Sequence, residues 1–401
     1  MRKTITIGDL GTIITGKTPP TTNKNYYGDY AVFIKPTDIS EQSKYTYETE
    51  EMYSKLAAEK YESSQIPKGA ICVPCIGTIG TKMTMAPCDC YTNQSINSIV
   101  CNENYDNEYV YYLIKNFLPG LKAYNLGTAS GREYVSKSNF EKIELVVEQD
   151  KTIQKKIGEI LSRYDSLIEN YQKQIKLLEE AAQRLYKEWF VDLHFPGHEN
   201  TKIVDGVPEG WEKKMIGEVC DTTSGGTPSR SKTEFYTGNI PWVKTKELND
   251  DFIFETEERI TDDAIRKSSA KLIPSGSILM AMYGATIGKL GIATKELSCN
   301  QACCVFLLSE DNVLRFYLYS WLLDNRTLLI SMGKGAAQPN LSQDMIKKLE
   351  IVIPSLHLLS IFDSKVKSIY KKIYYLSSQI RLLTEARDRL LPKLMSGEIA
   401  V

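Results

Sequence analysis

The sequence has no long apolar run and no excess of basic charge. Its 49 lysine and arginine residues balance 50 aspartate and glutamate residues, which gives a formal net charge of −1 at pH 7. No apolar stretch approaches the ~18 residues that a membrane-spanning helix needs. The polar start MRKTITIGDL does not resemble a secretory signal. We therefore expect a cytoplasmic protein with no membrane segment, and the 401 residues suffice for two or three domains.

The motifs of several enzyme classes are also missing. An adenine methyltransferase would need an Asn/Asp-Pro-Pro-aromatic motif and a glycine-rich loop after a strand, but the only Pro-Pro pair is Pro19-Pro20 in KTPPTT. No Walker A sequence is present, and the three histidines, His194, His198 and His357, lie beside predicted helix ends. Carboxylate clusters of the nuclease kind are too degenerate to test in this way. We predict no active site on this chain.

Nine cysteines raise the alternative of a metal site. Cys72-x-x-Cys75, followed by Cys88-x-Cys90, has a spacing that could hold zinc. However, the positions 207 residues after Cys72 and Cys75 are Leu279 and Met282, in a second copy of the same segment. Free cysteines are among the residues most often buried. Buried thiols are therefore the favoured interpretation, and an odd count suits a reducing compartment.

That second copy extends over nearly the whole chain. The segment TGKTPPTTNKNYYGDYAVF (15–33) resembles SGGTPSRSKTEFYTGNIPW (224–242), which lies 209 residues later. Further matches are Ile66-Pro67 with Ile273-Pro274, Asn93-Gln94 with Asn300-Gln301, GTIG (77–80) with ATIG (285–288), and Arg184-Leu185 with Arg389-Leu390. The separation changes only from 209 to 205, as small loop insertions and deletions would produce. The chain is an internal duplication.

Each copy has two unlike parts. The first part carries short β-rich runs such as AICVPCI and SILMAMYG, which are separated by Gly, Pro, Asn and Asp turns. This pattern predicts compact mixed α/β units. The second part of each copy has apolar residues spaced by threes and fours over about five heptads, which predicts a long helix with a coiled-coil seam. We expect domains at 1–148 and 196–353 (the latter with a linker), and helices at 149–195 and 354–401 (the latter with a C-terminal tail).

The seam of one helix must be buried, and its simplest partner is the duplicate. The seam residues that we expect to bind a partner helix are Tyr164, Tyr171, Leu178, Trp189, Ile369, Leu376, Leu383 and Leu394. The two helices could pair in parallel or antiparallel, and antiparallel pairing would give the duplicated halves a pseudo-two-fold axis. The alternative is that each helix packs only onto its own globular domain.

These features together resemble the specificity subunit of a type I DNA restriction-modification system. Each copy opens with IGD or IGE and a TGKTP or SGGTP loop, continues with IPKG or IPSG, a TIG turn and an NQ pair, and the chain closes on a helix ending LLPKLMSGEI. The resemblance covers essentially the whole chain, although only Glu148-Gln149 and Pro354 remain of the PP-x-x-EQ-like segment that commonly enters the helices. It implies two α/β target-recognition domains in a pseudo-two-fold duplication, separated by an antiparallel coiled coil.

The resemblance implies a division of labour. Each domain would read one half of a split double-stranded DNA target, while the helices would set the spacing and dock two methyltransferase subunits. S-adenosylmethionine would bind those subunits and not this chain; ATP and Mg would bind a restriction subunit where one is present, in two copies. The loop residues that we predict to contact DNA are Lys17, Thr18, Lys24, Lys35, Lys82, Arg132, Ser229, Arg230, Lys232, Lys244, Lys246, Lys289, Lys334, Gln338 and Asn340. Asn93-Gln94 and Asn300-Gln301 are instead interpreted as structural turn residues.

Two other classes of function remain open. The net charge and acidic patches such as Asp250-Asp251 and 255–258 are unusual for a DNA-binding protein. A duplicated coiled-coil scaffold that binds only proteins is one alternative, and an enzyme of unfamiliar fold with a site in each globular unit is another.

Overall fold

The computed structural model describes residues 2–77, 79–125, 127, 133–333 and 340–401. The chain forms two compact units, Met1–Asn170 with Arg381–Val401 (unit 1) and Tyr171–Ile380 (unit 2). Each unit therefore takes a share of both long helices, so the compact units are larger than the globular domains expected at 1–148 and 196–353. Among the described helices, none combines the length and the apolar character that crossing a bilayer requires.

Unit 1 is built on two four-stranded sheets, ordered β2-β9-β6-β7 and β3-β5-β4-β8, and on the pair β1-β10. Its strands are β1 (Arg2–Thr6), β2 (Gly11–Thr15), β3 (Tyr27–Gly28), β4 (Ala31–Ile34), β5 (Met52–Tyr53), β6 (Ile71–Pro74), β7 (Thr84–Met85), β8 (Tyr91–Thr92), β9 (Ile96–Cys101) and β10 (Glu144–Glu148). Its short helices are α1 (Ile7–Leu10), η1 (Lys24–Tyr26), α2 (Lys55–Lys60), η2 (Glu62–Ser64), α3 (Asn107–Phe117), η3 (Leu118–Tyr124) and α4 (Lys137–Glu141).

Unit 2 has a five-stranded sheet, β14-β21-β18-β19-β16, a three-stranded sheet, β17-β15-β20, and the pairs β13-β22 and β11-β12. Its strands are β11 (Ile203–Val204), β12 (Val207–Pro208), β13 (Glu212–Met215), β14 (Thr222–Ser224), β15 (Ile240–Val243), β16 (Asp251–Ile253), β17 (Glu258–Ile260), β18 (Ile278–Ala281), β19 (Leu290–Ala293), β20 (Ser298–Cys299), β21 (Cys303–Phe306) and β22 (Glu350–Ile353). Its short helices are η4 (Lys187–Val191), η5 (His198–Asn200), α6 (Ile216–Val219), η6 (Thr233–Tyr236), η7 (Thr245–Glu247), α7 (Asp262–Arg266), η8 (Gly284–Thr286), α8 (Arg315–Asp324), α9 (Arg326–Met332) and α10 (Gln343–Lys347).

The two units repeat each other in strand register. Phe33 pairs with Tyr91 in the parallel contact β4-β8, and Trp242 pairs with Ser298 in the parallel contact β15-β20. Likewise, Ile71 faces Ile99 between β6 and β9, and the positions 207 residues later, in β18 and β21, face each other in the same way. The duplication predicted from the sequence is therefore confirmed, and both copies have the predicted mixed α/β fold.

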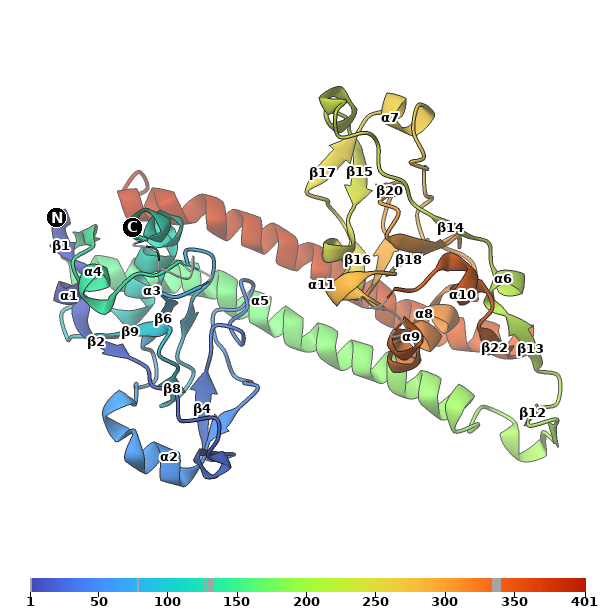
Figure 1. Cartoon of the computed structure of the whole chain (residues 1–401), viewed down its shortest axis with the longest axis horizontal. Helices are drawn as coiled ribbons and strands as arrows, with labels where there is room; N and C mark the ends of the chain where they lie inside the picture. Colours follow the sequence, from blue (N-terminus) through green and yellow to red (C-terminus); the bar gives the residue numbers. More distant parts are fainter. Residues whose placement is uncertain (1, 78, 126, 128–132, 334–339) are drawn as a thin grey trace. The chain divides into compact units, whose positions relative to one another are not determined.

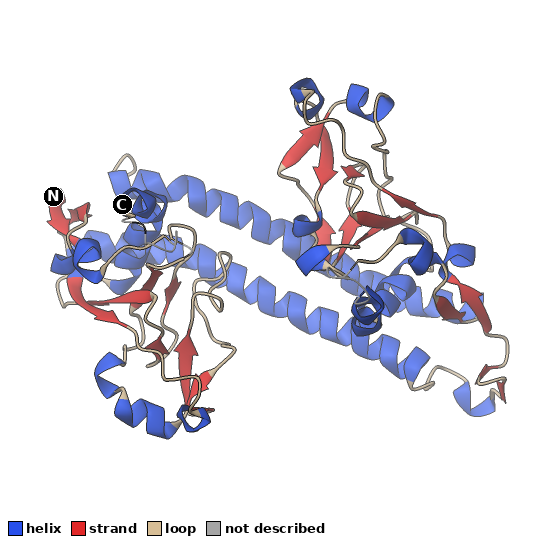
Figure 2. Ribbon diagram, in the orientation of Figure 1, coloured by secondary structure: helices blue, strands red, loops and turns tan. Residues whose placement is uncertain are grey.

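The two predicted long helices are present and unbroken (Figures 1 and 2). They are α5 (Lys151–Tyr186) and α11 (Leu356–Ser396). The side chain of Asp150 accepts a hydrogen bond from the backbone N–H of Thr152 (2.8 Å) and so caps the start of α5. Gly397, with φ +80°, adopts the left-handed conformation that commonly ends a helix.

The helices pack on each other and on the globular parts in each unit. In unit 1, Ile157 and Leu161 of α5 share a core with Leu391 and Leu394 of α11 and with α3. In unit 2, the end of α5 and the residue Trp189 beyond it share a core with Phe362 and the start of α11. The beginning of each helix therefore lies against the end of the other, and the pair is antiparallel. The alternative in which the helices contact only their own globular domains is wrong.

Gly158 explains how α5 comes close to α3. A Cβ atom at this position would lie 2.8 Å from the Cβ of Glu108 and 3.1 Å from the backbone nitrogen of Tyr109. Glycine within a helix costs about 1 kcal/mol relative to alanine. Here it leaves room for the first turn of α3, and this position accounts for the one glycine in the central turns of the seam.

A buried ion pair joins three helices of unit 1. The guanidinium of Arg387 in α11 donates to the carboxylate of Asp165 in α5, and both side chains are only 6% exposed. The hydroxyl of Tyr112 in α3 donates to the other oxygen of Asp165 (2.5 Å). Burial lowers the pKa of Arg387, but the neighbouring Asp165 and Asp388 together more than offset this effect and the net pKa is raised. Arg387 therefore remains charged within the core.

The corresponding position in unit 2 has no charges. Asp165 and Tyr370 are related by the repeat (205 residues), as are Ala182 and Arg387, and both Ala182 and Tyr370 are buried. The ring of Tyr370 stacks on Phe316 at 4.2 Å with the planes nearly parallel. In unit 1, α11 is therefore joined to α5 by a buried ion pair. At the related place in unit 2, α11 makes an aromatic contact with α8 instead.

We expect R387M to lower the free energy of unfolding by about 3–5 kcal/mol, because it leaves the Asp165 carboxylate buried without its counter-ion. The triple variant Y112F/D165M/R387M removes all three polar groups together and should lose much less. Urea denaturation followed by circular dichroism measures both. Equal losses in the two variants would contradict a penalty from the unpaired charge.

Candidate nucleic-acid interface

The loop that follows β2 in unit 1 and the loop that follows β14 in unit 2 are held in the same way. A Cβ atom on Gly16 would lie 2.1 Å from the carbonyl oxygen of Thr92, and one on Gly225 would lie 2.2 Å from that of Cys299. Because backbone blocks both places, only glycine fits. The repeated glycine of TGKTP and SGGTP thus lets this loop cross directly over β8 or β20.

Side-chain hydrogen bonds then fix the rest of this loop. The hydroxyl of Thr18 donates to Gln94, and that of Thr227 donates to Gln301. Asn93 and Asn300 each accept a hydrogen bond from the backbone two residues later, at 3.0 and 3.2 Å. The NQ pairs are therefore structural residues, as predicted, and they position the loops that carry the predicted contacts.

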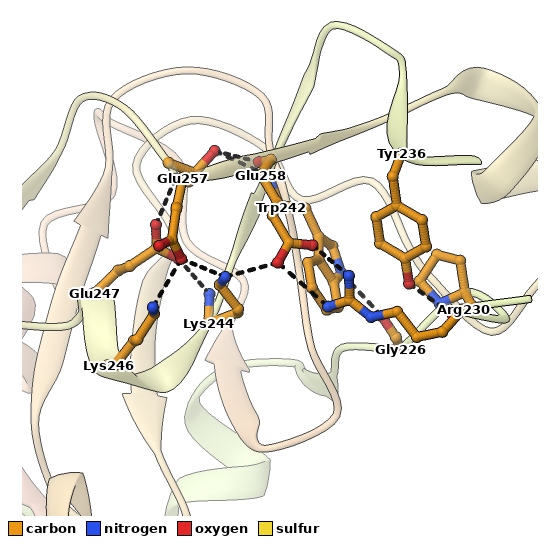
Figure 3. Close-up of polar contacts among 11 residues, drawn as sticks. Gly226, Arg230, Tyr236, Trp242, Lys244, Lys246, Glu247, Glu257 and Glu258 are labelled. Carbon is orange, nitrogen blue, oxygen red and sulfur yellow. Dashed lines mark hydrogen bonds and ion pairs between the residues drawn. The ribbon is translucent and has the colours of Figure 1, made fainter. Parts of the chain in front are cut away.

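A charged cluster lies beside this loop in unit 2 (Figure 3). The ammonium of Lys244 pairs with Glu257 and, at 2.8 Å, with Glu258. The carboxylate of Glu247 accepts from the backbone nitrogens of Lys244 and Glu257, both at 2.7 Å. Lys246 pairs with Glu257 at 2.7 Å, and hydrogen bonds from Lys244 and Lys246 lower the pKa of Glu257 to about 2.

Unit 1 contains the same arrangement. Lys35 pairs with Glu50 (2.7 Å) and Glu51 (3.3 Å), and Asp38 accepts from the backbone nitrogens of Lys35 and Glu50. These residues precede Lys244, Glu257, Glu258 and Glu247 by 209 or 207 positions. We call the two groups the paired-glutamate clusters of unit 1 and unit 2.

The paired-glutamate cluster of unit 2 contains a further cation, Arg230. Its guanidinium pairs with Glu258 at 2.6 Å and lies over the rings of Tyr236 (4.3 Å) and Trp242 (5.0 Å) (Figure 3). The hydrogen bond to Glu258 raises the pKa of Arg230. The indole nitrogen of Trp242 donates to the carbonyl of Gly226 (3.1 Å) and so ties the ring to the glycine-containing loop. Arg230 is consequently held in one orientation although it is exposed.

The clusters differ in charge. In unit 2, three cations, Arg230, Lys244 and Lys246, face Glu247, Glu257 and Glu258. In unit 1, threonines Thr21 and Thr37 stand at the positions of Arg230 and Lys246, so Lys35 faces three carboxylates alone. One cluster is balanced and the other has a net charge of −2. Both offer hydrogen-bond donors and acceptors, but neither is a basic patch.

The remaining predicted contact residues are spread over other places. Lys289 pairs with Asp250 (2.7 Å), Lys17 donates to Ser63 (3.3 Å), and the hydroxyls of Ser229 and Ser231 are 2.8 Å apart. Lys24, Lys232 and Asn340 are exposed, and Lys82 is half-buried. Arg132, Lys334 and Gln338 lie outside the described residues. The structure brings Arg230, Lys244 and Lys246 together, whereas Lys289 belongs to a separate ion-pair group.

The seam residues are mostly used within the chain. Trp189, Leu376 and Leu394 are buried, and Leu178 and Ile369 pack against the core of unit 2. Tyr164, Tyr171 and Leu383 are half-buried. Most of the predicted seam residues are therefore covered within the units themselves.

Sequence reasoning missed the carboxylates of these clusters and the aromatic support of Arg230. It treated the acidic run at 255–258 as an objection to DNA binding. The sequence does contain a signal for these carboxylates. The pair Glu50-Glu51 is repeated as Glu257-Glu258 at the same separation as Asn93-Gln94 and Asn300-Gln301.

The cysteines do not gather around a metal. In the part of the chain that the structure describes, no group of three or more Cys, His, Asp or Glu side chains has an arrangement suited to a metal ion. Cys72 and Cys75 are buried in different apolar clusters, and burial raises the pKa of each thiol to about 12. The prediction that these two thiols are buried is confirmed.

Each of the two α/β units carries a polar cluster of the same geometry, and both units contain parts of the two long antiparallel helices. The family model for the type I restriction modification DNA specificity domain matches residues 2–180 and again 208–386. The chain therefore belongs to this family and is a type I specificity subunit.

Individual relatives agree with this assignment. The type I restriction enzyme MjaIX specificity subunit of Methanocaldococcus jannaschii is 28% identical over 98% of this chain and 93% of its own length. The HindI specificity subunit of Haemophilus influenzae is 27% identical over 62% of this chain and 68% of its own length. The crystal structure of the S subunit from M. genitalium has the same fold, with a TM-score of 0.59 at 16% identity over 98% of this chain and 96% of that one.

We predict one fast thiol in the native chain. Of the nine cysteines, Cys88 is exposed, Cys101 is half-buried and the others are buried. Titration with Ellman's reagent should give a rapid phase of one thiol, which C88S abolishes. Several fast thiols, or release of zinc on titration, would contradict this burial pattern.

Proposed function

We propose that each unit reads one half of a split, asymmetric DNA target. The observation that carries this proposal is the pair of paired-glutamate clusters, which share one geometry but differ in chemistry. Two readers with the same scaffold and different donors and acceptors would select different base sequences. The helix pair would set the number of unread base pairs between the two halves.

The cluster of unit 2 supplies the chemistry for direct readout. An arginine fork suits the two acceptors of guanine in the major groove, and carboxylates accept from the amino group of cytosine. Arg230 is stacked on two rings and paired with Glu258, which limits its freedom before DNA arrives. Lysines outside the cluster, such as Lys24 and Lys232, would contact phosphates, which position the protein without selecting sequence.

Catalysis in this proposal belongs to other subunits. Two methyltransferase subunits would dock on this chain and bind S-adenosylmethionine; restriction subunits, where present, would bind ATP and Mg. Because the net charge is −1, the chain alone would bind DNA weakly and with a strong dependence on salt.

Methyl transfer tests the proposal as a whole. The pure chain should transfer no methyl group to DNA, and the complex with its methyltransferase subunit should methylate an asymmetric split site that sequencing of the host methylome identifies. Replacing residues 1–148 with those of another family member should change one half of that site and leave the other unchanged. Turnover by the pure chain, or a change in both halves, would refute the proposed roles.

We predict that R230M relaxes the half-site read by unit 2. Methionine keeps an apolar side chain over Tyr236 and Trp242 but removes the guanidinium group that would bind a base. Discrimination between bases at one base pair should therefore fall by about 5- to 150-fold, the equivalent of ~1–3 kcal/mol. The control R259M removes a half-buried arginine of the same unit that pairs with Glu255. Methylation of single-base-substituted duplexes measures both, and loss of the half-site read by unit 1 would argue against separate readers.

A further inference from the structure

Arg230 lies in a turn whose backbone is the same in both units. The turn at 229–232 is closed by a hydrogen bond from the backbone N–H of its last residue to the carbonyl of its first, at 3.1 Å. The turn at 20–23 in unit 1 is closed by the same bond, at 3.0 Å, and lies 209 positions earlier. The second residue of the turn is therefore Thr21 in unit 1 and Arg230 in unit 2.

A tyrosine hydroxyl binds the chain just before each turn. Tyr236 donates to the carbonyl of Pro228 (2.6 Å), and Tyr27 donates to the carbonyl of Pro19 (2.8 Å). In unit 2, the guanidinium of Arg230 lies over this tyrosine ring at 4.3 Å (Figure 3). Unit 1 thus has the same ring, held by the same bond, beside its own turn.

The carboxylate that pairs with Arg230 also has a counterpart. Glu258, at 2.6 Å from the guanidinium, corresponds to Glu51, which is 39% exposed and pairs with Lys35 at 3.3 Å. Burial and the charge of Glu51 raise the pKa of Tyr27, as burial and Glu258 do for the tyrosine of unit 2. Both partners that hold the arginine in unit 2, a ring and a carboxylate, are therefore present in unit 1.

The loop is fixed at the same carbonyl in each unit by a different ring. In unit 2, the indole nitrogen of Trp242 donates to the carbonyl of Gly226 (3.1 Å). In unit 1, Phe33 replaces the tryptophan, and Tyr53, whose ring lies 4.6 Å from it, donates to the equivalent carbonyl of Lys17 (2.6 Å). The position of the loop is thus set without the side chain at the second residue of the turn.

The side chains at this position are directed to the outside of the units. Thr21 is exposed, and the side chain of Arg230 is 54% exposed. The bonds that form the turn come from backbone atoms and from the tyrosine hydroxyl. A substitution here therefore changes what the turn presents and leaves the turn itself in place.

We propose that this turn position, Thr21 in unit 1 and Arg230 in unit 2, selects one base pair in each half-site, and that Tyr27 and Glu51 can hold an arginine at position 21. The proposal rests on the proposed function. An arginine oriented by a ring and a carboxylate binds the two acceptors of guanine, whereas threonine is too short to make that paired contact and offers one hydroxyl and one methyl group. One substitution in one turn would then account for part of the difference between the two targets.

The variant T21R tests the proposal by a gain of selectivity. In the complex with the methyltransferase subunit, it should raise the preference for G·C at one base pair of the half-site read by unit 1 by about 5- to 150-fold. The other half-site should not change. Methylation of duplexes that carry single-base substitutions measures the preference, and sequencing of the host methylome gives the whole site.

The matched control is T22R, which places the same side chain one residue further along the same turn. It adds the same charge and should strengthen DNA binding without a change of sequence preference, because phosphate contacts select no sequence. A second comparison removes the carboxylate. T21R/E51Q, measured against E51Q, should show a smaller gain than T21R measured against the wild type.

Each outcome decides between distinct statements. A wild-type complex that methylates no split site refutes the proposed function. A wild-type complex with a split site, together with equal preferences in T21R and T22R, refutes the selecting role of this position and leaves that function intact. A T21R complex altered at several base pairs, or in the half-site of unit 2, would show that position 21 acts on the scaffold. A melting temperature of T21R well below that of T22R would show that Tyr27 and Glu51 do not hold an arginine, and either result overturns the inference.

Discussion

The buried pair of Asp165 and Arg387 is the interaction on which the rest of unit 1 depends. A seam of leucine and isoleucine can slide by one heptad at small cost, because one apolar side chain replaces another. A buried carboxylate has no such freedom, since any other register leaves it without a cation. By also accepting from Tyr112, Asp165 fixes α3 against both long helices, and α3 in turn fixes the sheets. The pair specifies an arrangement more than it adds net stability.

Duplication has kept the scaffold and changed the charged groups. Strand registers, the glycine beneath each loop and the threonine–glutamine bond are the same in both copies. The differences fall at Asp165 against Tyr370, at Glu108 against Phe316, and at Thr21 against Arg230. Each difference replaces a charged or polar group in one unit with an uncharged or differently charged one in the other. The two units therefore share one backbone scaffold but differ in the charged groups on their surfaces and in their cores.

Much of this architecture follows from the sequence because its signals are local or repeated. The helices could be predicted from apolar spacing, the α/β units from alternation with turn residues, and the burial of Cys72 and Cys75 from their counterparts Leu279 and Met282. The role of the NQ pairs also followed from their place before apolar runs. Each of these features depends on neighbours in the chain or on comparison between the copies.

The charge pairing could not be predicted in the same way. Lys44 and Glu108 are 64 residues apart, and nothing near either one indicates the other. Lys35 and Lys244 are predicted as DNA contacts because lysine suits contacts to phosphate and guanine, but its charge serves an internal ion pair equally well. Two of the acidic residues that argued against DNA binding, Glu257 and Glu258, hold Lys244. Which charges meet depends on the folded arrangement of loops, and periodicity carries no information about it.

The shared helices also determine the order in which the protein can be completed during synthesis. Leu391, Leu394 and Met395 belong to the core that also contains Ile5, Ile7 and Leu10. A ribosome therefore produces the first strands of unit 1 long before it produces the residues that close their core, while unit 2 is finished when residue 380 emerges. Unit 2 can therefore be complete first, whereas the core of unit 1 is completed only by residues 381–401. Until those residues emerge, the apolar side chains that they cover in unit 1 are incompletely buried.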